Sequence, residues 1–344
     1  MRKSRLVIIG LGNVGRRLLE LMELKRPLLQ ERFGLELVVA AASDTSGAAL
    51  ASTDAGLDAS VLVGLKRAGQ GVALLPERGR PGMSPLDVLR SVDADVLVEL
   101  SLTNLKDGEP GLGAIRAALA RGMSVVTANK GPLVLAYPEL AERARSQRVK
   151  LLHSATVTGG LPTLNIGQRD LGAAVIEEFE GVVNGTTNYI LSRMAEGQSY
   201  AEALKHAQDI GMAEADPTLD VDGWDAANKL VIIANAILRR PTTLKDVTVE
   251  GIRGVTAQDL QKAREHGKVV KLIARAEKAG EDYRLTVRPT HLDKTHPLAD
   301  VGAGMMGIIY HTDINGTVFA SIEEHDPYPT AAAVLRDIVT VYRD

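Results

Sequence analysis

The stretch Leu6-Val-Ile-Ile-Gly10-Leu-Gly12-Asn-Val-Gly15 decides the fold of the amino-terminal part of the chain. Its four apolar residues are typical of a buried parallel strand, and the residues that follow fit the pattern G-x-G-x-x-G. In that pattern Gly10 permits a tight turn, Gly12 lets a pyrophosphate approach the backbone, and Gly15 lets helix and strand pack closely. The next helix offers free N–H groups and a positive dipole end. The stretch therefore predicts a dinucleotide-binding turn, with an ordinary strand-to-helix turn as the alternative.

Around this stretch, short apolar runs alternate with helix-like patterns over the first 150 residues. Such alternation predicts an α/β domain of the Rossmann type, with a parallel sheet and right-handed crossovers. The glycine-containing residues 45–90 indicate only a short helix, a strand and loops. The expected strands are 6–9, 37–41, 96–100, 125–127 and 149–152, and the expected helices are 16–24, 113–121 and 137–148.

After Pro162 the pattern changes to that of a mixed α+β domain. Apolar runs of strand length and segments of helical spacing no longer alternate regularly there. The expected strands are 178–184, 247–251, 269–276, 284–290 and 308–313, and the expected helices are 187–196, 200–211, 226–238 and 330–342.

The composition excludes several classes of protein. The chain has 344 residues, 45% hydrophobic and 24% charged, which fits two or three globular domains and excludes a disordered or fibrous protein. A net charge of -3 gives no basic field for nucleic acid or anionic lipid. No run approaches the length of a membrane span, and glycines interrupt the first apolar run too early for a signal peptide. We therefore expect a soluble, cytoplasmic protein.

The absence of cysteine, 0 in the whole chain, excludes disulfides, thiolate metal sites and any thiol nucleophile. An aldehyde therefore cannot be oxidised through a thiohemiacetal, and interconversion of a carbonyl and an alcohol remains. That reaction needs a group that protonates the developing alkoxide. Among the histidines only His153, at a strand end, is a candidate, and we favour its interpretation as a packed residue.

Two lysines lie in better contexts for this proton transfer. Lys130, in Thr-Ala-Asn-Lys-Gly-Pro, follows an apolar strand at the edge where open α/β sheets bind ligands. Lys229 ends a segment from Glu214 that holds five acidic residues within sixteen. Asp225 and Lys229 share a helix face at i,i+4. The acidic segment is either a site for a substrate ammonium group or a solvated helix start, with Asp220 or Asp222 as the N-cap.

The second strand ends at Asp44, a candidate ligand for the ribose 2′-hydroxyl, although it lies later than the usual spacing. An NADP site needs a cation there, and only Lys66 and Arg67 could reach in from elsewhere in the sequence. The residues alone therefore favour NAD, or the use of both NAD and NADP.

At this point the chain resembles homoserine dehydrogenase over essentially its full length. The resemblance is carried in order by short segments, several of them specific to the family. They are Gly-Leu-Gly-Asn-Val-Gly-Arg at 10–16, Glu-Pro-Gly-Leu at 109–112, Val-Val-Thr-Ala-Asn-Lys-Gly-Pro-Leu at 125–133, Ala-Thr-Val at 155–157, Gly-Gly-Leu-Pro at 159–162, Asn-Gly-Thr-Thr-Asn-Tyr-Ile-Leu at 184–191, the block 214–229, and Pro-Thr-Ala-Ala-Ala-Val-Leu-Arg-Asp at 329–337.

The resemblance implies NAD(P)-dependent interconversion of L-homoserine and L-aspartate 4-semialdehyde, a step of threonine and methionine biosynthesis, in a homodimer. It also implies roles for individual residues. Lys229 would donate the proton, with Lys130 and Asp220 completing the catalytic set; Glu214, Asp220, Asp225, Asn184, Gly185, Thr186 and Thr187 would bind the substrate; and Gly10, Gly12, Asn13, Val14, Gly15, Asp44, Ser101, Thr103, Asn129 and Lys130 would bind the cofactor.

The chain departs from the family pattern in three places. Ser154 replaces the glutamate that commonly binds a monovalent cation, so the main-chain carbonyls of Val157, Gly159 and Leu161 remain as expected sodium ligands. The segment 322–328 is bulkier and more charged than the family's glycine-rich loop. The sequence ends at Asp344, so we expect neither the carboxy-terminal regulatory domain that many members carry nor feedback inhibition through it.

By the same analogy we expect three regions. Residues 1–150 with 326–344 would bind the dinucleotide, 151–162 with 286–325 would form a dimerisation region, and 163–285 would bind substrate. Two rival functions stay open: an NAD(P)-dependent reductase of another small amino-acid aldehyde, and an inactive nucleotide-sensing homologue.

Overall fold

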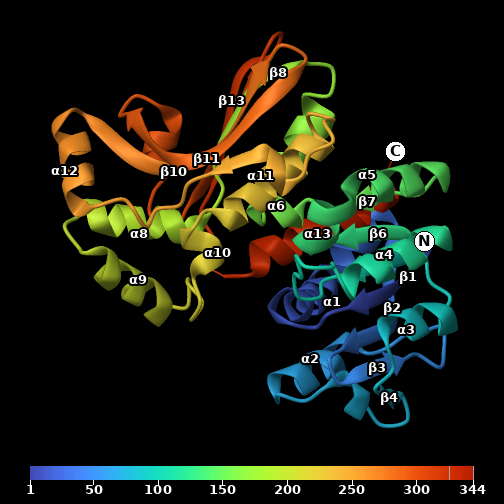
Figure 1. Ribbon diagram of the computed structural model, residues 1–344. Helices are drawn as coiled ribbons and strands as arrows, with labels where there is room; N and C mark the ends of the chain where they lie inside the picture. Colours follow the sequence, from blue (N-terminus) through green and yellow to red (C-terminus); the bar gives the residue numbers. More distant parts are fainter. Residues whose placement is uncertain (325, 344) are drawn as a thin grey trace. The chain divides into compact units, whose positions relative to one another are not determined.

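A computed structural model describes residues 1–324 and 326–343, and it divides into two compact units, shown in Figure 1. The first unit combines residues 1–160 with 326–344, and the second comprises residues 161–325. His325, in the segment that departs from the family pattern, and Asp344 lie outside the described residues. Among the described residues, no helix is long and apolar enough to span a membrane.

The first unit is built on a seven-stranded sheet in the order β4-β3-β2-β1-β5-β6-β7. Five neighbouring strands of this sheet, β2, β1, β5, β6 and β7, are parallel, as the sequence predicts. Strands β3 and β4 extend the sheet beyond β2 with antiparallel pairing. The strands are β1 (Arg2–Ile9), β2 (Leu35–Asp44), β3 (Gly47–Leu50), β4 (Gly79–Pro81), β5 (Val96–Glu99), β6 (Ser124–Thr127) and β7 (Leu151–Leu152).

From β1 the chain runs to β2 on one side, whereas β5, β6 and β7 follow on the other. Because crossovers are right-handed, this reversal places helices on both faces of the sheet. In sheets of this kind ligands bind outside the carboxyl ends of the strands where the order reverses, which here are β1 and β5. Helix α13 packs against α1, and α4 packs against α5. The helices are α1 (Asn13–Phe33), α2 (Ala59–Arg67), α3 (Pro85–Ser91), α4 (Gly111–Ala120), α5 (Lys130–Ser146), α6 (Ala155–Thr158) and α13 (Tyr328–Val341).

The core of this unit is aliphatic, as the low aromatic content requires. Leu6 and Ile8 of β1 are fully buried with Leu18 of α1, and Val334 and Ile338 of α13 complete the same cluster. The last helix of the chain therefore belongs to the core of the first unit.

The second unit contains a six-stranded sheet in the order β13-β12-β8-β10-β11-β9. All its neighbouring strands are antiparallel except β11 and β9. The mixed α+β expectation is confirmed, whereas the sequence interpretation did not include β13. The strands are β8 (Ile176–Val182), β9 (Val247–Val249), β10 (Lys268–Ala279), β11 (Asp282–Asp293), β12 (Met306–Thr312) and β13 (Gly316–Ile322).

Helix α11 is the central helix of the second unit and packs on β9, β10 and β11. Nearly all its residues are buried, which agrees with its apolar sequence around a few polar positions. Helix α8 packs against α9 and β10. The helices are α7 (Thr163–Asn165), α8 (Gly185–Ala195), α9 (Tyr200–Asp209), α10 (Thr218–Val221), α11 (Trp224–Ala236) and α12 (Ala257–Glu265), with a π-helical segment at Ile166–Asp170.

Candidate active site

The glycine fingerprint forms a tight turn between β1 and α1. Gly10 has φ +93°, and a Cβ there would lie 2.4 Å from the carbonyl oxygen of Leu100; at Gly15 a Cβ would lie 2.2 Å from that of Gly10. Gly12, by contrast, has nothing within 4 Å of its Cβ position. It is the N-cap of α1, and no side chain caps the helix there. The open space and the free helix amino terminus fit a dinucleotide pyrophosphate.

Asp44 lies at the end of β2, but its carboxylate already has partners. Oδ1 accepts hydrogen bonds from the backbone N–H and hydroxyl of Ser46, and Oδ2 accepts from Lys66 Nζ at 2.6 Å and Val72 N at 3.2 Å. Arg67, the other cation considered, pairs with Glu20. The edge of β2 thus carries a carboxylate suited to a ribose hydroxyl and, against it, an ammonium group suited to a phosphate.

The residues expected to hold the cofactor beyond the fingerprint follow β5 and β6. Asn129 is buried and caps α5, because its Oδ1 accepts a hydrogen bond from Gly131 N at 3.0 Å. Its Nδ2 donates to the hydroxyl of Ser101 at 3.2 Å. Lys130 is the first residue of α5, and Thr103 is exposed in the loop after β5. Ser101, Asn129 and Lys130 thus lie together at the carboxyl edge of the sheet.

In the second unit, Lys229 lies on α11 with its ammonium group held at two points. Nζ lies 2.8 Å from Oδ2 of Asp225, one helical turn earlier, and donates to the carbonyl oxygen of Val183 at 2.6 Å. The sequence predicts the first contact through the i,i+4 spacing. The second contact depends on where Val183, the residue after β8, lies in the fold, and no pattern in the sequence predicts it. Both side chains are nearly buried, which strengthens the ion pair.

Asn184 connects the acidic residues to this pair. Its Nδ2 donates to Oδ1 of Asp220 at 2.6 Å and to Oδ2 of Asp225 at 2.8 Å. Its Oδ1 caps α8 by accepting from the backbone N–H of Thr187 at 2.8 Å. One amide therefore fixes two carboxylates and the start of a helix. The sequence placed Asn184 in the pocket but did not indicate that it bridges the two aspartates.

The alternative interpretation of Asp220 or Asp222 as the N-cap of α11 is wrong. The N-cap is Gly223, with φ +84°, a conformation that an aspartate adopts only at a cost. Asp220 lies within α10, and Asp222 pairs with Arg253.

The remaining residues of the motif 184–188 build the wall around this cluster. At Gly185 a Cβ would lie 2.8 Å from the carbonyl oxygen of Gly304, so the loop before β12 can pass only over a glycine. The hydroxyl of Thr186 donates to the carbonyl oxygen of Met212 at 3.1 Å. Thr187 is buried and hydrogen-bonded to Asn184. Glu214 lies on the loop between α9 and α10. Its side chain is exposed and is not part of this hydrogen-bonded cluster.

His153 is a packed residue, as favoured from the sequence. It is buried, its ring meets that of Tyr137 edge-on, and burial lowers its pKa to about 4. Next to it, Ser154 uses its backbone N–H and its hydroxyl to donate to Asp337 of α13 at 2.8 and 2.6 Å. The Ser154 hydroxyl hydrogen therefore goes to a carboxylate, and a sodium ion on the carbonyls of Val157, Gly159 and Leu161 stays a prediction.

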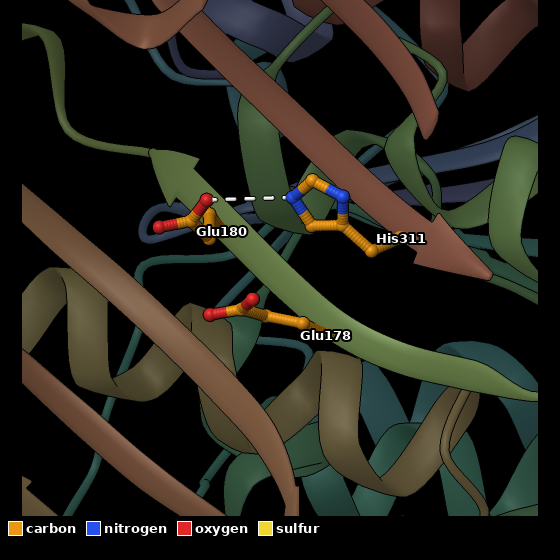
Figure 2. A group of neighbouring side chains, drawn as sticks. All are labelled: Glu178, Glu180 and His311. Atoms are coloured by element: carbon orange, nitrogen blue, oxygen red, sulfur yellow. Dashed lines mark ion pairs between the residues drawn. The ribbon is translucent and has the colours of Figure 1, made fainter. Parts of the chain in front are cut away.

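A second polar cluster lies on β8 and β12 of the second unit, and Figure 2 shows Glu178, Glu180 and His311 side by side. Glu180 is buried, and the dashed line marks its 3.6 Å ion pair with His311. Arg275 pairs with both glutamates. Burial acts to raise the pKa of Glu180, but the bond and the charge of Arg275 outweigh it and lower that pKa. With its cation supplied by Arg275, this is an ion-pair network rather than a metal centre.

One buried acid of the nucleotide unit was missed. Glu99 is the last residue of β5 and is fully buried beneath Ser101 and Thr127. The signal was available, since an acidic residue closes an otherwise apolar strand at the edge where ligands bind.

Comparison with known proteins gives one consistent result. The family model for homoserine dehydrogenase matches residues 162–339. The chain is 37% identical over 338 residues to homoserine dehydrogenase of Methanocaldococcus jannaschii, with 98% of each chain covered. It is 33% identical to the NAD(+)-dependent homoserine dehydrogenase of Pseudomonas canavaninivorans, covering 100% of this chain and 97% of the other. A hyperthermophilic archaeal homoserine dehydrogenase in complex with NADPH superposes with a TM-score of 0.85 at 27% identity, covering 99% and 98%. The chain belongs to the homoserine dehydrogenase family.

Proposed function

We propose that this chain interconverts L-homoserine and L-aspartate 4-semialdehyde with NAD(P), using Lys229 as the proton donor. Membership of the family supports the reaction. The hydrogen-bonded group of Lys229, Asp225 and Asn184 supports the assignment of Lys229 as the proton donor. The bound dinucleotide supplies the hydride during reduction and accepts it during oxidation. Relatives that use NAD(+) and that bind NADPH support the use of both cofactors.

The contacts of Lys229 suit it to proton transfer. A protonated lysine has three N–H groups, and here one points to Asp225 and one to the carbonyl oxygen of Val183. The third is available for a substrate oxygen. When the carbonyl carbon gains a hydride, Lys229 gives its proton to the carbonyl oxygen, so that the product is the neutral alcohol. The ion pair with Asp225 holds Nζ in place without using that third N–H.

The other polar residues would hold the amino-acid part of the substrate. Asp220 on α10, with Glu214 on the loop before that helix, would give the negative charge that a substrate ammonium group needs. Lys130 would give a positive charge for the substrate carboxylate. Asn184, Gly185, Thr186 and Thr187 would line the substrate pocket. Only some of these side chains are hydrogen-bonded to one another, and bound substrate would connect the others.

We extend the proposal to the setting of the enzyme. It would act in the cytoplasm as a homodimer, with residues 151–162 and 286–325 as the dimerisation region and 163–285 as the substrate-binding region. A sodium ion would bind the main-chain carbonyls of Val157, Gly159 and Leu161, where the chain passes from the first unit to the second. Sedimentation velocity of the purified chain tests the dimer directly.

The test of the activity follows NAD(P)H absorbance with L-aspartate 4-semialdehyde, against glyceraldehyde and succinate semialdehyde. Parallel reactions use NADH and NADPH. We expect rapid oxidation of both cofactors with aspartate semialdehyde alone. Equal rates with all three aldehydes would favour a general aldehyde reductase, and NADPH binding without turnover of any aldehyde would favour a nucleotide sensor.

A further inference from the structure

The carboxylate of Glu99 lies buried at the centre of the nucleotide-binding edge. Glu99 ends β5, where it pairs in register with Ile9 of β1 and Thr127 of β6, and its relative exposure is 0%. The residue after it, Leu100, places its carbonyl oxygen against Gly10 of the fingerprint. Because Glu99 is fully buried, it cannot contact a bound ligand itself. It lies directly beneath the loops after β5 and β6, which we expect to contact the ligand.

The hydrogen-bond donors to this carboxylate lie in the loop after β5 and at the end of β6, where the next loop begins. Oε1 accepts the backbone N–H of Ser101 at 2.9 Å and also the Ser101 hydroxyl. The hydroxyl of Thr127 lies within hydrogen-bond distance of two oxygens of Glu99, the main-chain carbonyl oxygen at 3.0 Å and Oε2 at 3.2 Å. The oxygen of that same hydroxyl accepts the backbone N–H of Asn129 at 3.0 Å. Asn129 in turn donates to the Ser101 hydroxyl. Glu99 is thus the acceptor that joins the loop after β5 to the loop after β6.

Helix α4 is also fitted to this carboxylate. Its first residue is Gly111, where a Cβ would lie 3.0 Å from Oε2 of Glu99 and 2.7 Å from Nδ2 of Asn129. Only a glycine allows the helix to begin so close to the two side chains. The positive end of the helix dipole at α4 favours a negative charge at Glu99, but burial is the larger effect and raises the pKa of this carboxyl group.

We propose that Glu99 is a positioning residue of the reaction, which orients Ser101 and Asn129 and, through the Asn129 cap of α5, sets Lys130 in place. This inference rests on the proposed function, since it assigns Ser101, Asn129 and Lys130 to the cofactor and substrate. Lys130 directly follows the capping residue, so a shift of Asn129 moves the start of the helix that carries Lys130.

Glu99→Gln tests the inference because it keeps the size of the side chain and replaces one of its two carboxyl oxygens with an NH₂ group. One amide oxygen cannot replace two carboxylate oxygens as acceptor, so the joined loops should loosen. We expect kcat to fall at least tenfold, while the Kd for NADPH, set chiefly by the fingerprint, changes less than threefold. Glu142→Gln, on the exposed part of α5, is the matched control and should retain full kcat.

The emission enhancement of bound NADPH gives a readout that does not depend on turnover. It reports how firmly the nicotinamide ring is held, and we expect Glu99→Gln to lose at least half of it. Both quantities are normalised to the number of NADPH-binding sites. If Glu99→Gln retains kcat and emission enhancement within twofold of the unmodified enzyme, the proposal is overturned. If the unmodified enzyme binds NADPH but reduces no aldehyde, the proposed activity fails while the emission difference still tests Glu99.

Thr127→Val is the second variant, should Glu99→Gln not fold. It removes the buried hydroxyl between Glu99 and Asn129 and keeps the shape of the side chain. We expect the same loss of kcat and emission, with no further loss in the double variant, because both changes break one connection. Full activity of Thr127→Val, or additive losses in the double variant, would contradict the proposal.

Discussion

Oδ2 of Asp225 lies 2.8 Å from Nζ of Lys229, one turn along a buried helix, and both atoms are held by further bonds to Asn184 and Val183, the two residues that follow β8. Lys229→Ala should lower kcat by about 10²–10⁴-fold, the usual contribution of a general acid. The Kd for NADPH, measured by fluorescence titration, should change little, because the fingerprint belongs to the other unit.

Lys205→Ala is the control for that change. Lys205 also forms an i,i+4 ion pair, with Asp209, but on the exposed surface of α9. Its removal should leave kcat unchanged. Near-normal turnover of Lys229→Ala would rule out the proton-donor role.

Asn184 has two tasks that two substitutions separate. Ser at this position can still cap α8, whereas Ala cannot, so Asn184→Ala should lose about 1 kcal/mol more stability than Asn184→Ser. Both lack the amide that bridges Asp220 and Asp225, and both should lose at least about tenfold in kcat/KM, as expected for bonds to charged groups. Urea unfolding and steady-state kinetics measure the two effects. Full activity of Asn184→Ser would show that the bridge has no part in the reaction.

Lys66 should discriminate between the two cofactors. Its ammonium group lies against Asp44 at the end of β2, where the adenosine ribose of a dinucleotide is bound in this fold. Lys66→Ala should raise the KM for NADPH about 10-fold or more, since a charged hydrogen bond contributes roughly 1.5–3 kcal/mol. The KM for NADH should change much less. Arg67→Ala, which breaks only the pair with Glu20, serves for comparison, and an equal change for both cofactors in Lys66→Ala would refute the prediction.

His153 should make the nucleotide unit sensitive to acid. Burial lowers its pKa to about 4, whereas an unfolded chain keeps about 6.5. Between these values the unfolded state binds more protons, so the free energy of unfolding falls as the pH falls, by about 3 kcal/mol in total. Above about pH 6.5 this residue contributes no pH dependence.

His153→Phe keeps a ring against Tyr137 and removes the titrating group. Urea unfolding between pH 4 and 7 should therefore show a flatter pH dependence for this variant. The exposed His266→Gln provides the control and should keep the slope of the unmodified protein. A slope of His153→Phe that matches the unmodified protein would contradict the buried, neutral state of His153.

The sequence predicted the parallel strands and the main helices because their signals are local. The fingerprint, the apolar runs and the 3.6-residue spacing all lie within one element. The antiparallel pair β3 and β4 has no such signal, since its residues become strands only by pairing with β2. Strand β13 lies at a sheet edge with its side chains largely exposed, so its apolar residues, such as Phe319, do not mark a buried face.

The candidate site was predicted as a set of residues but not as a set of contacts. Lys229 and Asp225 could be paired from their spacing alone. The bond from Lys229 to Val183, the bridge through Asn184 and the buried Glu99 all join segments far apart in the chain. Such contacts follow from the fold, and the residue types alone allow other partners.

The return of α13 to the first unit has a consequence for the newly made protein. Val334, Ile338 and other apolar residues of α13 fill a core whose remaining buried residues come from the first half of the chain. The hydroxyl of Tyr342 also meets that of Ser4 at 2.5 Å. During synthesis from the amino terminus, the nucleotide-binding unit stays open on this side until α13 leaves the ribosome. The second unit has by then emerged in full, so of the two units the one that begins first is completed second.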